Sequence, residues 1–156
     1  MAKGFVQAYS AIMAKGVPAY KTVFTHLAKE EPEPCIVHCT AGKDRTGVIV
    51  ALMYLLCGVE PKTVAREYSL TDEGLKHMKP LFAERLLKNP ALAGNEEGVK
   101  NMISSKSENM EATIEMIKQR HGSAEKYLLD TVGLSSEQVA RLKKNLTAQD
   151  KPMFSA

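Results

Sequence analysis

Residues 38–47 read His-Cys-Thr-Ala-Gly-Lys-Asp-Arg-Thr-Gly and lie between two apolar runs. The run that leads into them, 35–39, is short and carries β-branched residues at its centre, which predicts a buried strand. The run that follows, 46–57, has the length of a buried core helix and stops before Gly58, a residue typical of helix ends. The chain is therefore expected to pass from a strand through a turn of small residues into a helix.

This arrangement predicts an anion site. The first amides of a helix have no partner inside the helix, and the helix dipole places partial positive charge at the same end. Successive amides of the preceding loop can form a concave nest around that point. Phosphate is the natural guest of such a site. We expect it to be held by the backbone and side chains of Thr40, Ala41, Gly42, Lys43, Asp44 and Arg45.

The side chains of the loop indicate nucleophilic catalysis. Cys39 stands at the foot of the nest, and such surroundings lower the pKa of a thiol from about 8.5 into the range of roughly 3.5–7.5. The thiolate can attack phosphorus and form a covalent phosphocysteine. Arg45, six residues later, can hold two phosphate oxygens with its planar fork. We expect Thr46 to donate to the Cys39 sulfur and His38 to orient the loop.

Taken alone, Cys39 is better explained as a buried structural cysteine. The register of Gly42, Arg45 and Thr46 with it favours catalysis or phosphate binding, because Gly42 permits a close backbone approach. A zinc site is not expected, since Cys35 and Cys39 lie in one predicted strand and no second ligand pair follows at a suitable spacing. We therefore expect chemistry without a metal or cofactor.

Residues 38–47 resemble the signature of the protein tyrosine phosphatase superfamily: His-Cys, five residues, Arg, then Ser or Thr. They are most similar to the atypical tyrosine-phosphatase-like family of fungi and bacteria, whose loop reads Ala-Gly-Lys-Asp-Arg-Thr-Gly, with His38 and Gly47 as supporting residues. The segments 121–128 and 132–135 also look like the C-terminal end of that family, so the resemblance covers roughly residues 18–147. It implies an α/β cysteine-phosphatase fold, predominantly helical in this chain, and hydrolysis of phosphate monoesters.

The resemblance also implies roles for two charged loop residues. The loop aspartate is the proposed acid of the family, and that role maps onto Asp44, which would protonate the leaving oxygen and then deprotonate water. The alternative is an ordinary helix N-cap. Lys43 is expected as a second cation at the mouth, like a lysine in phosphatases that accept phosphoinositides. Phosphotyrosine proteins, phosphoserine or phosphothreonine proteins, and phosphoinositides all stay open as substrates.

The family's N-terminal half, with several strands and an Asn-Phe-Arg-Asp-like motif, is not found here. We expect 1–156 to be a single phosphatase-like domain that lacks this strand-rich part. A homodimer would cover the exposed sheet edge. Two alternatives remain: a truncated, inactive module that binds phosphate or a phosphoinositide, and a rhodanese-like sulfur transferase. The full spacing from His38 to Thr46 argues against the second.

The bulk composition sets broad limits. With 156 residues, 44% hydrophobic and 25% charged, the chain has an ordinary globular composition. Its net charge of +3 is too small to indicate a nucleic-acid partner. Three cysteines, an odd and low number, predict a reduced, cytoplasmic protein. The longest apolar run, 48–57, has about half the length of a membrane span and predicts a core helix.

Helices are predicted along most of the remaining chain. Apolar residues at helical spacing stop at Gly16, and a second helix starts at Pro18. Ser135 and Gln138 have the spacing of a capping box. The predicted strand has no partner in this pattern, so either other strands are misread or its partners come from elsewhere. Further helices are expected over 61–69, 71–88, 108–120 and 123–130, and a loop over 89–95.

Overall fold

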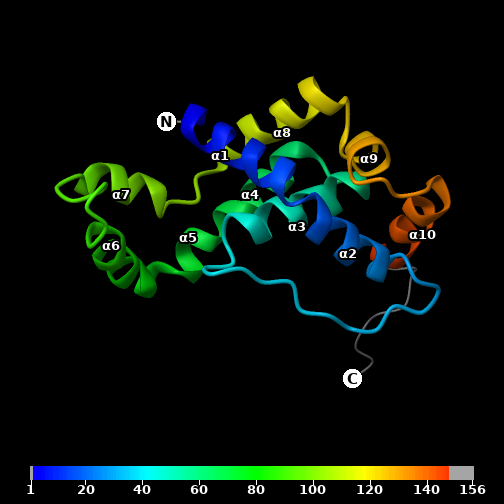
Figure 1. The fold of residues 1–156 in the computed structure, drawn as a ribbon, viewed down its shortest axis with the longest axis horizontal. Helices are drawn as coiled ribbons and strands as arrows, with labels where there is room; N and C mark the ends of the chain where they lie inside the picture. Colours follow the sequence, from blue (N-terminus) through cyan, green and yellow to red (C-terminus); the bar gives the residue numbers. More distant parts are fainter. Residues whose placement is uncertain (1, 148–156) are drawn as a thin grey trace.

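The structure, a computed structural model, describes residues 2–147, and helices form its framework. No residue in this range belongs to a β-strand. In chain order the elements are α1 (Ala2–Lys15), α2 (Val17–Leu27), α3 (Arg45–Leu56), α4 (Pro61–Ser69), α5 (Thr71–Gly74), the 3₁₀ turn η1 (Lys76–Met78), α6 (Lys79–Leu87), α7 (Glu96–Met102), α8 (Ser107–His121), α9 (Ala124–Lys126), the π-helical turn η2 (Tyr127–Thr131) and α10 (Ser136–Leu146) (Figure 1).

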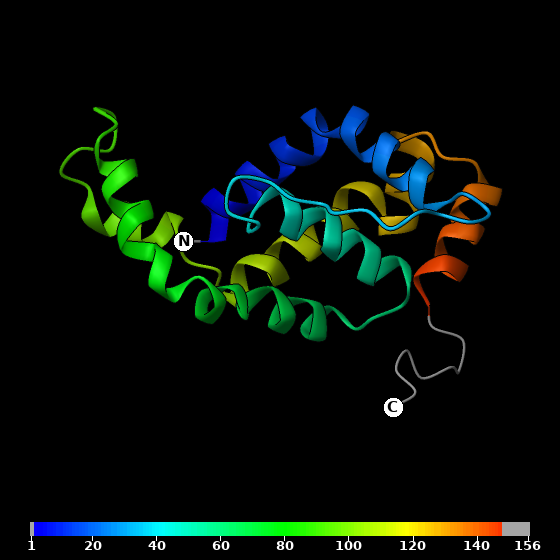
Figure 2. The ribbon, with the colours of Figure 1, turned by 90° about the horizontal axis from the view of Figure 1, so that it is seen from below.

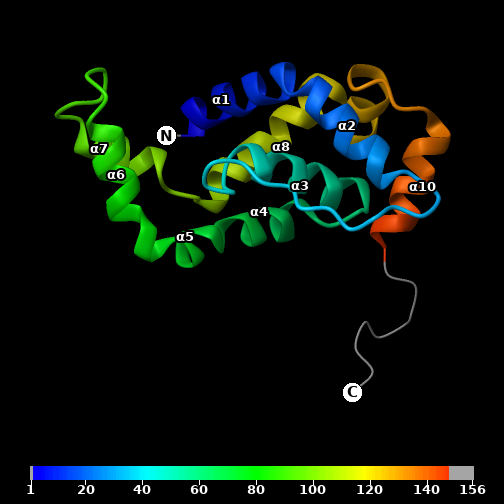
Figure 3. The same ribbon diagram turned by 60° about the horizontal axis from the view of Figure 1, so that its bottom comes forward.

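The helical body is organised around α8, which packs against α1 and α4. Helix α3 packs against α1 and α4, while α2, α9 and α10 gather at the far end of the body (Figures 1 and 3). No helix in the described part of the chain is both long enough and apolar enough to cross a lipid bilayer. The largest fully buried side chains include Tyr9, Met13, Phe24, Val48, Leu52, Val64, Met110, Ile117, Tyr127, Leu128 and Leu142.

Several helix boundaries follow from local signals and confirm the sequence prediction. Helix α1 ends beside Gly16, where an added Cβ would lie 2.6 Å from the carbonyl oxygen of Ile12. Pro18 occupies the first turn of α2, where its missing N–H costs no helical hydrogen bond. The capping box is present: Ser135 accepts from the amide of Gln138, and the Gln138 side chain accepts from the amide of Ser135.

Two helix predictions need correction. The helix expected over 71–88 is broken into α5, η1 and α6, and Pro80 lies in the first turn of α6. The loop expected over 89–95 ends where an unpredicted helix, α7, begins. Asn95 caps α7 by accepting from the amide of Gly98 at 2.9 Å. Helices α6 and α7 pack against each other and project from the body as an arm (Figures 1 and 2).

The prediction of an α/β fold with a buried strand over 35–39 is wrong. This segment is extended and runs beside α3, but within 2–147 it pairs with no other backbone (Figure 2). Ile36 is 89% exposed, and only Val37 packs against the core. β-branched residues favour an extended backbone locally, but a strand exists only with a hydrogen-bonded neighbour. The predicted helix over 46–57 is observed as α3, which begins and ends one residue earlier.

Candidate active site

The amides of the loop between the extended segment and α3 are not used by the helix. Gly42 has φ +66°, in the left-handed region that favours glycine. The first backbone hydrogen bonds into α3 come from Gly47 to the carbonyl of Lys43, at 3.1 Å, and from Val48 to that of Asp44, at 2.9 Å. The amides before Gly47 therefore have no helical partner, and the positive end of the α3 dipole lies at the loop.

Cys39 lies at the start of this loop, in surroundings that favour its thiolate. Burial alone raises the pKa of the thiol. The hydroxyl and amide of Thr46 and the amides of Ala41 and Gly42 stabilise the thiolate, and they bring the pKa down from 9.0 to about 7. The Thr46 hydroxyl is buried and has no hydrogen-bond partner in the described chain, so its proton is available to a thiolate at Cys39.

Arg45, in the first turn of α3, closes the loop from the other side. Its Nη2 donates to the Thr40 hydroxyl at 2.9 Å, which ties the two ends of the loop together. The guanidinium is exposed and borders the same hollow as Cys39. An arginine fork beside a thiolate is suited to bind a phosphate and to stabilise charge on it. His38 is exposed, and its Nδ1 makes a long hydrogen bond of 3.4 Å with the Cys39 carbonyl.

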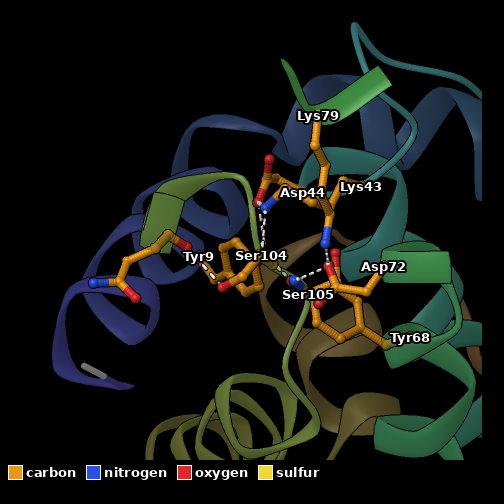
Figure 4. Close-up of polar contacts among 9 residues, drawn as sticks. Tyr9, Lys43, Asp44, Tyr68, Asp72, Lys79, Ser104 and Ser105 are labelled. Carbon is orange, nitrogen blue, oxygen red and sulfur yellow. Dashed lines mark hydrogen bonds and ion pairs between the residues drawn. The ribbon is translucent and has the colours of Figure 1, made fainter. Parts of the chain in front are cut away.

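Lys43 does not reach the mouth of the loop, where the sequence analysis places it. Its side chain is only 6% exposed, and its Nζ lies 2.6 Å from Oδ1 of Asp44. The same ammonium donates to the carbonyl of Ser104 at 3.3 Å (Figure 4). It also lies 5.2 Å from the ring centroid of Phe5. The charge is thus compensated by a carboxylate, a carbonyl and an aromatic face. Only the backbone amide of Lys43 is left for a bound anion.

Asp44 occupies the N-cap position of α3, but its side chain does not cap the helix. Its Oδ1 accepts hydrogen bonds from the Lys43 ammonium and from the hydroxyl of Tyr9, a residue of α1 (Figure 4). The distance between the Tyr9 hydroxyl oxygen and Oδ1 is 2.7 Å. The side chain is 39% exposed, so the carboxyl group is held from below while part of it faces solvent. An aspartate so placed can exchange a proton with a molecule bound at the loop.

Two hollows flank α1 beside the loop. The first, of about 540 Å³, contains Cys39 and Arg45, and its walls include Ile12, Tyr20 and Ile49. The second, of about 510 Å³, contains Asp44 and has Phe5, Tyr9 and Met102 in its walls. Ala8 and Ile12, which lie one turn apart on α1, border both hollows, while Cys39 and Asp44 line different ones.

The loop contacts from α1 and from 104–105 were not expected from sequence. Tyr9 and Phe5 read only as the apolar stripe of a helix, and Ser104 follows a segment without any recognised motif. The signal that pairs Tyr9 with Asp44 is spatial, because 35 residues separate them. The other two cysteines stay outside the loop: Cys35 is exposed, and Cys57 lies partly buried at the end of α3.

Comparison with known proteins shows which family the chain is related to. The sequence model of the tyrosine phosphatase family matches residues 1–148. The chain belongs to the tyrosine phosphatase family. This confirms the resemblance carried by residues 38–47. A tyrosine-protein phosphatase of Nostoc commune is 28% identical over 142 residues. The triple specificity protein phosphatase PtpB of Mycobacterium tuberculosis is 26% identical over 121 residues.

The matches cover more of this chain than of its relatives. They include 90% of this chain but 48% of the Nostoc protein, and 70% of this chain but 42% of the mycobacterial one. The chain therefore spans about half the length of these curated relatives. Within that half the loop, its helix and the partners of Asp44 are all present.

Proposed function

We propose that this chain carries the catalytic loop of a cysteine-dependent phosphatase, which hydrolyses phosphate monoesters through a phosphocysteine. The observation that carries the proposal is the environment of Cys39. A thiol with a pKa of about 7, held by a hydroxyl and three amides at a helix N-terminus, is half thiolate near neutral pH. Arg45, which borders the same hollow, supplies the positive charge that a bound phosphate requires.

In the first step, the loop amides from Thr40 to Arg45 and the Arg45 guanidinium bind the phosphate oxygens. The Cys39 sulfur attacks phosphorus, a sulfur–phosphorus bond forms, and the bond from phosphorus to the leaving oxygen breaks. Asp44 gives a proton to that oxygen, so the product leaves as a neutral alcohol or phenol. The developing charge on the phosphoryl oxygens is stabilised by donors that are already in place.

In the second step, a water oxygen attacks the phosphorus of the phosphocysteine. Asp44, now a carboxylate, takes the proton of that water. The sulfur–phosphorus bond breaks and its electron pair returns to the Cys39 sulfur. The hydroxyl of Thr46 donates to the departing sulfur and stabilises the thiolate, and inorganic phosphate leaves the loop.

The walls of the Cys39 hollow support aryl phosphates as the leading substrate class. Ile12, Tyr20 and Ile49 offer apolar contacts to a phenyl ring, as in phosphotyrosine. The burial of Lys43 removes the side-chain argument for phosphoinositides. Phosphoserine and phosphothreonine proteins and phosphoinositides are the competing substrates. A comparison of kcat/KM across these substrates decides among them.

The proposal extends to location and assembly. We propose a cytoplasmic location, because a reducing compartment keeps a catalytic thiol such as Cys39 in its active form. The extended segment 35–39, which pairs with no other backbone within 2–147 and leaves Ile36 exposed, is the surface that a second copy would cover in a homodimer. The mass of the protein in solution, measured over a range of concentrations, tests this: a monomer at every concentration contradicts it.

The function is tested by hydrolysis of 4-nitrophenyl phosphate with a metal chelator present. We expect activity in the unmodified chain, none in Cys39→Ser, and full activity in the matched control Cys35→Ser, whose thiol is exposed outside the loop. Activity that survives in Cys39→Ser contradicts the cysteine mechanism. No activity in either protein, with saturable vanadate binding by the unmodified chain, supports a phosphate-binding module instead. Thiocyanate formed from thiosulfate and cyanide would indicate a sulfur transferase.

A further inference from the structure

A chain of hydroxyl groups leads from the core to Asp44. The hydroxyl of Tyr68, on α4, lies 2.6 Å from that of Tyr9, and the Tyr9 hydroxyl lies 2.7 Å from Oδ1 of Asp44 (Figure 4). Tyr9 is 1% exposed and Tyr68 is 4% exposed. Helices α1 and α4 therefore meet the catalytic loop through two buried phenols that the proposed mechanism does not use.

The direction of these hydrogen bonds is set by proton count. Oδ1 of Asp44 also accepts from Lys43, so it acts as an acceptor toward Tyr9, and the single hydroxyl proton of Tyr9 points to it. The Tyr68 hydroxyl must then donate to the oxygen of Tyr9. Burial raises the pKa of Tyr9 and raises that of Tyr68 to about 12, so both stay protonated donors. Each bond in such a chain polarises the next.

Both donors converge on one oxygen of the carboxyl group. Oδ1 receives the Tyr9 hydroxyl and the Lys43 ammonium, whereas Oδ2 has no partner in the described part of the chain. A carboxyl oxygen that accepts two hydrogen bonds, one of them from a cation, is the poorer site for a proton. When Asp44 carries a proton in the reaction, Oδ2 is therefore the favoured oxygen for it, and this oxygen is free to face a ligand.

The position of Tyr68 is itself tied to the loop motif. A Cβ on Gly47 would lie 3.1 Å from the Tyr68 ring, so this glycine lets α3 and α4 approach closely. The Tyr9 ring packs edge-on against Phe5 and Tyr68, with ring centroids at 5.7 and 6.4 Å. Since packing fixes both rings, their hydroxyls are held in place before a ligand binds.

We propose that Tyr9 is a positioning residue for the reaction, and that Tyr68 supports it. The hydroxyl of Tyr9, together with Lys43, holds Oδ1 so that the proton on Oδ2 is presented to the leaving-group oxygen. This inference rests on the proposed function, in which Asp44 is the acid. It assigns to α1 a part in protonating the leaving group, exerted through Asp44, which no residue of the loop motif reveals.

The variant Tyr9→Phe tests this, because it removes the hydroxyl and keeps the ring. We compare phenyl phosphate, whose leaving group needs a proton, with 2,4-dinitrophenyl phosphate, whose leaving group does not. We measure kcat/KM, which reports the steps up to formation of the phosphocysteine, because the later hydrolysis is common to both esters. We expect kcat/KM to fall by about 10- to 100-fold for phenyl phosphate and by less than about threefold for the dinitrophenyl ester. Tyr68→Phe, which removes no contact with Asp44, should show the same pattern with a smaller loss.

Tyr127→Phe is the matched control, since the Tyr127 hydroxyl is buried and donates to the carbonyl of Met13 on α1 at 2.8 Å. It should lose stability without changing the ratio of the two substrates. If Tyr9→Phe slows both esters equally, the Tyr9 hydroxyl has only a structural role, and if it slows neither, the hydroxyl has no role; either result overturns the inference.

In the Asp44→Asn background, Tyr9→Phe should have no further effect on the ratio of the two substrates. An unmodified chain that is inactive on both esters refutes the proposed function instead.

Discussion

The ammonium of Lys43 lies 2.6 Å from Oδ1 of Asp44, so two neighbouring loop residues of opposite charge are paired underneath the loop instead of both facing its mouth. The contact combines a nearly buried cation with a carboxylate that is 39% exposed. It explains how a lysine can belong to the proposed phosphate-binding loop without offering its side chain to a phosphate. It also ties the proposed acid to the body of the protein.

Replacement of Lys43 should lower stability. Lys43→Met keeps the aliphatic stem and removes the charge that compensates Asp44. We expect the free energy of unfolding to fall by about 1–3 kcal/mol, less than for a fully buried pair because Asp44 reaches solvent. Urea denaturation measures this. Lys76→Met is the matched control: its pair with Glu73 is largely exposed, and its loss should cost less than about 1 kcal/mol. Equal losses in the two variants would contradict the structural role of Lys43.

Lys43 should not select phosphoinositides. Its ammonium is buried, so a second phosphate group on a ligand cannot reach it. Lys43→Met can slow the reaction through Asp44, but it should slow aryl phosphate and phosphoinositide substrates by the same factor. The ratio of their kcat/KM values measures this. A selective loss of phosphoinositide turnover would mean that Lys43 turns outward when a ligand binds.

Cys39 should be the most reactive thiol near neutral pH. Because its pKa is lowered to about 7, the rate of alkylation by iodoacetamide should rise with pH and reach half its plateau near pH 7. Burial raises the pKa of Cys57, so that residue should react only at higher pH.

Thr46→Val removes the hydroxyl donor and should move the pH midpoint of Cys39 alkylation upward. A midpoint that does not move shows that the loop amides alone hold the thiolate. Mass spectrometry of the labelled peptides separates the sites.

The conformation of Gly42 should matter to both fold and function. An added Cβ meets no atom within 4 Å, so Gly42→Ala acts only through the strain of φ +66°. We expect a loss of about 1–2 kcal/mol in stability, together with weaker vanadate binding as the loop relaxes. Gly58→Ala is matched, since Gly58 has φ +81°, open space around it and no part in the loop. It should lose similar stability and keep its vanadate affinity. Equal affinity in both variants would contradict the nest of amides.

Arg45 should not be replaceable by lysine. Arg45→Lys keeps the charge but loses the fork and the bond from Nη2 to Thr40. We expect kcat/KM for aryl phosphates to fall by about 10²–10³-fold. Arg141→Lys is the matched control, because Arg141 donates through Nη2 to the exposed Glu137 and lies outside the loop. A mild loss in Arg45→Lys, similar to the control, would show that charge alone suffices.

Predictions that depended on nearby residues were largely confirmed. The end of α1 at Gly16, the start of α2 at Pro18 and the capping box of Ser135 and Gln138 each involve contacts within four residues along the chain. Helix α7 was missed because its seven residues carry few apolar positions, although Asn95 is a typical cap. The strand over 35–39 failed for the opposite reason: its apolar pattern is local, but pairing requires a distant neighbour.

The sequence by itself determined the order of the loop: a cysteine, a glycine able to take positive φ, an arginine six residues after the cysteine, and a helix behind them. Those features are local, because backbone amides and a helix end follow from a short stretch of chain. Tertiary structure alone decided where the charged side chains point. Lys43 turns inward to Ser104, 61 residues away, and Asp44 meets a hydroxyl from α1, since only the packing of α1, α4 and the 104–105 segment brings those partners under the loop.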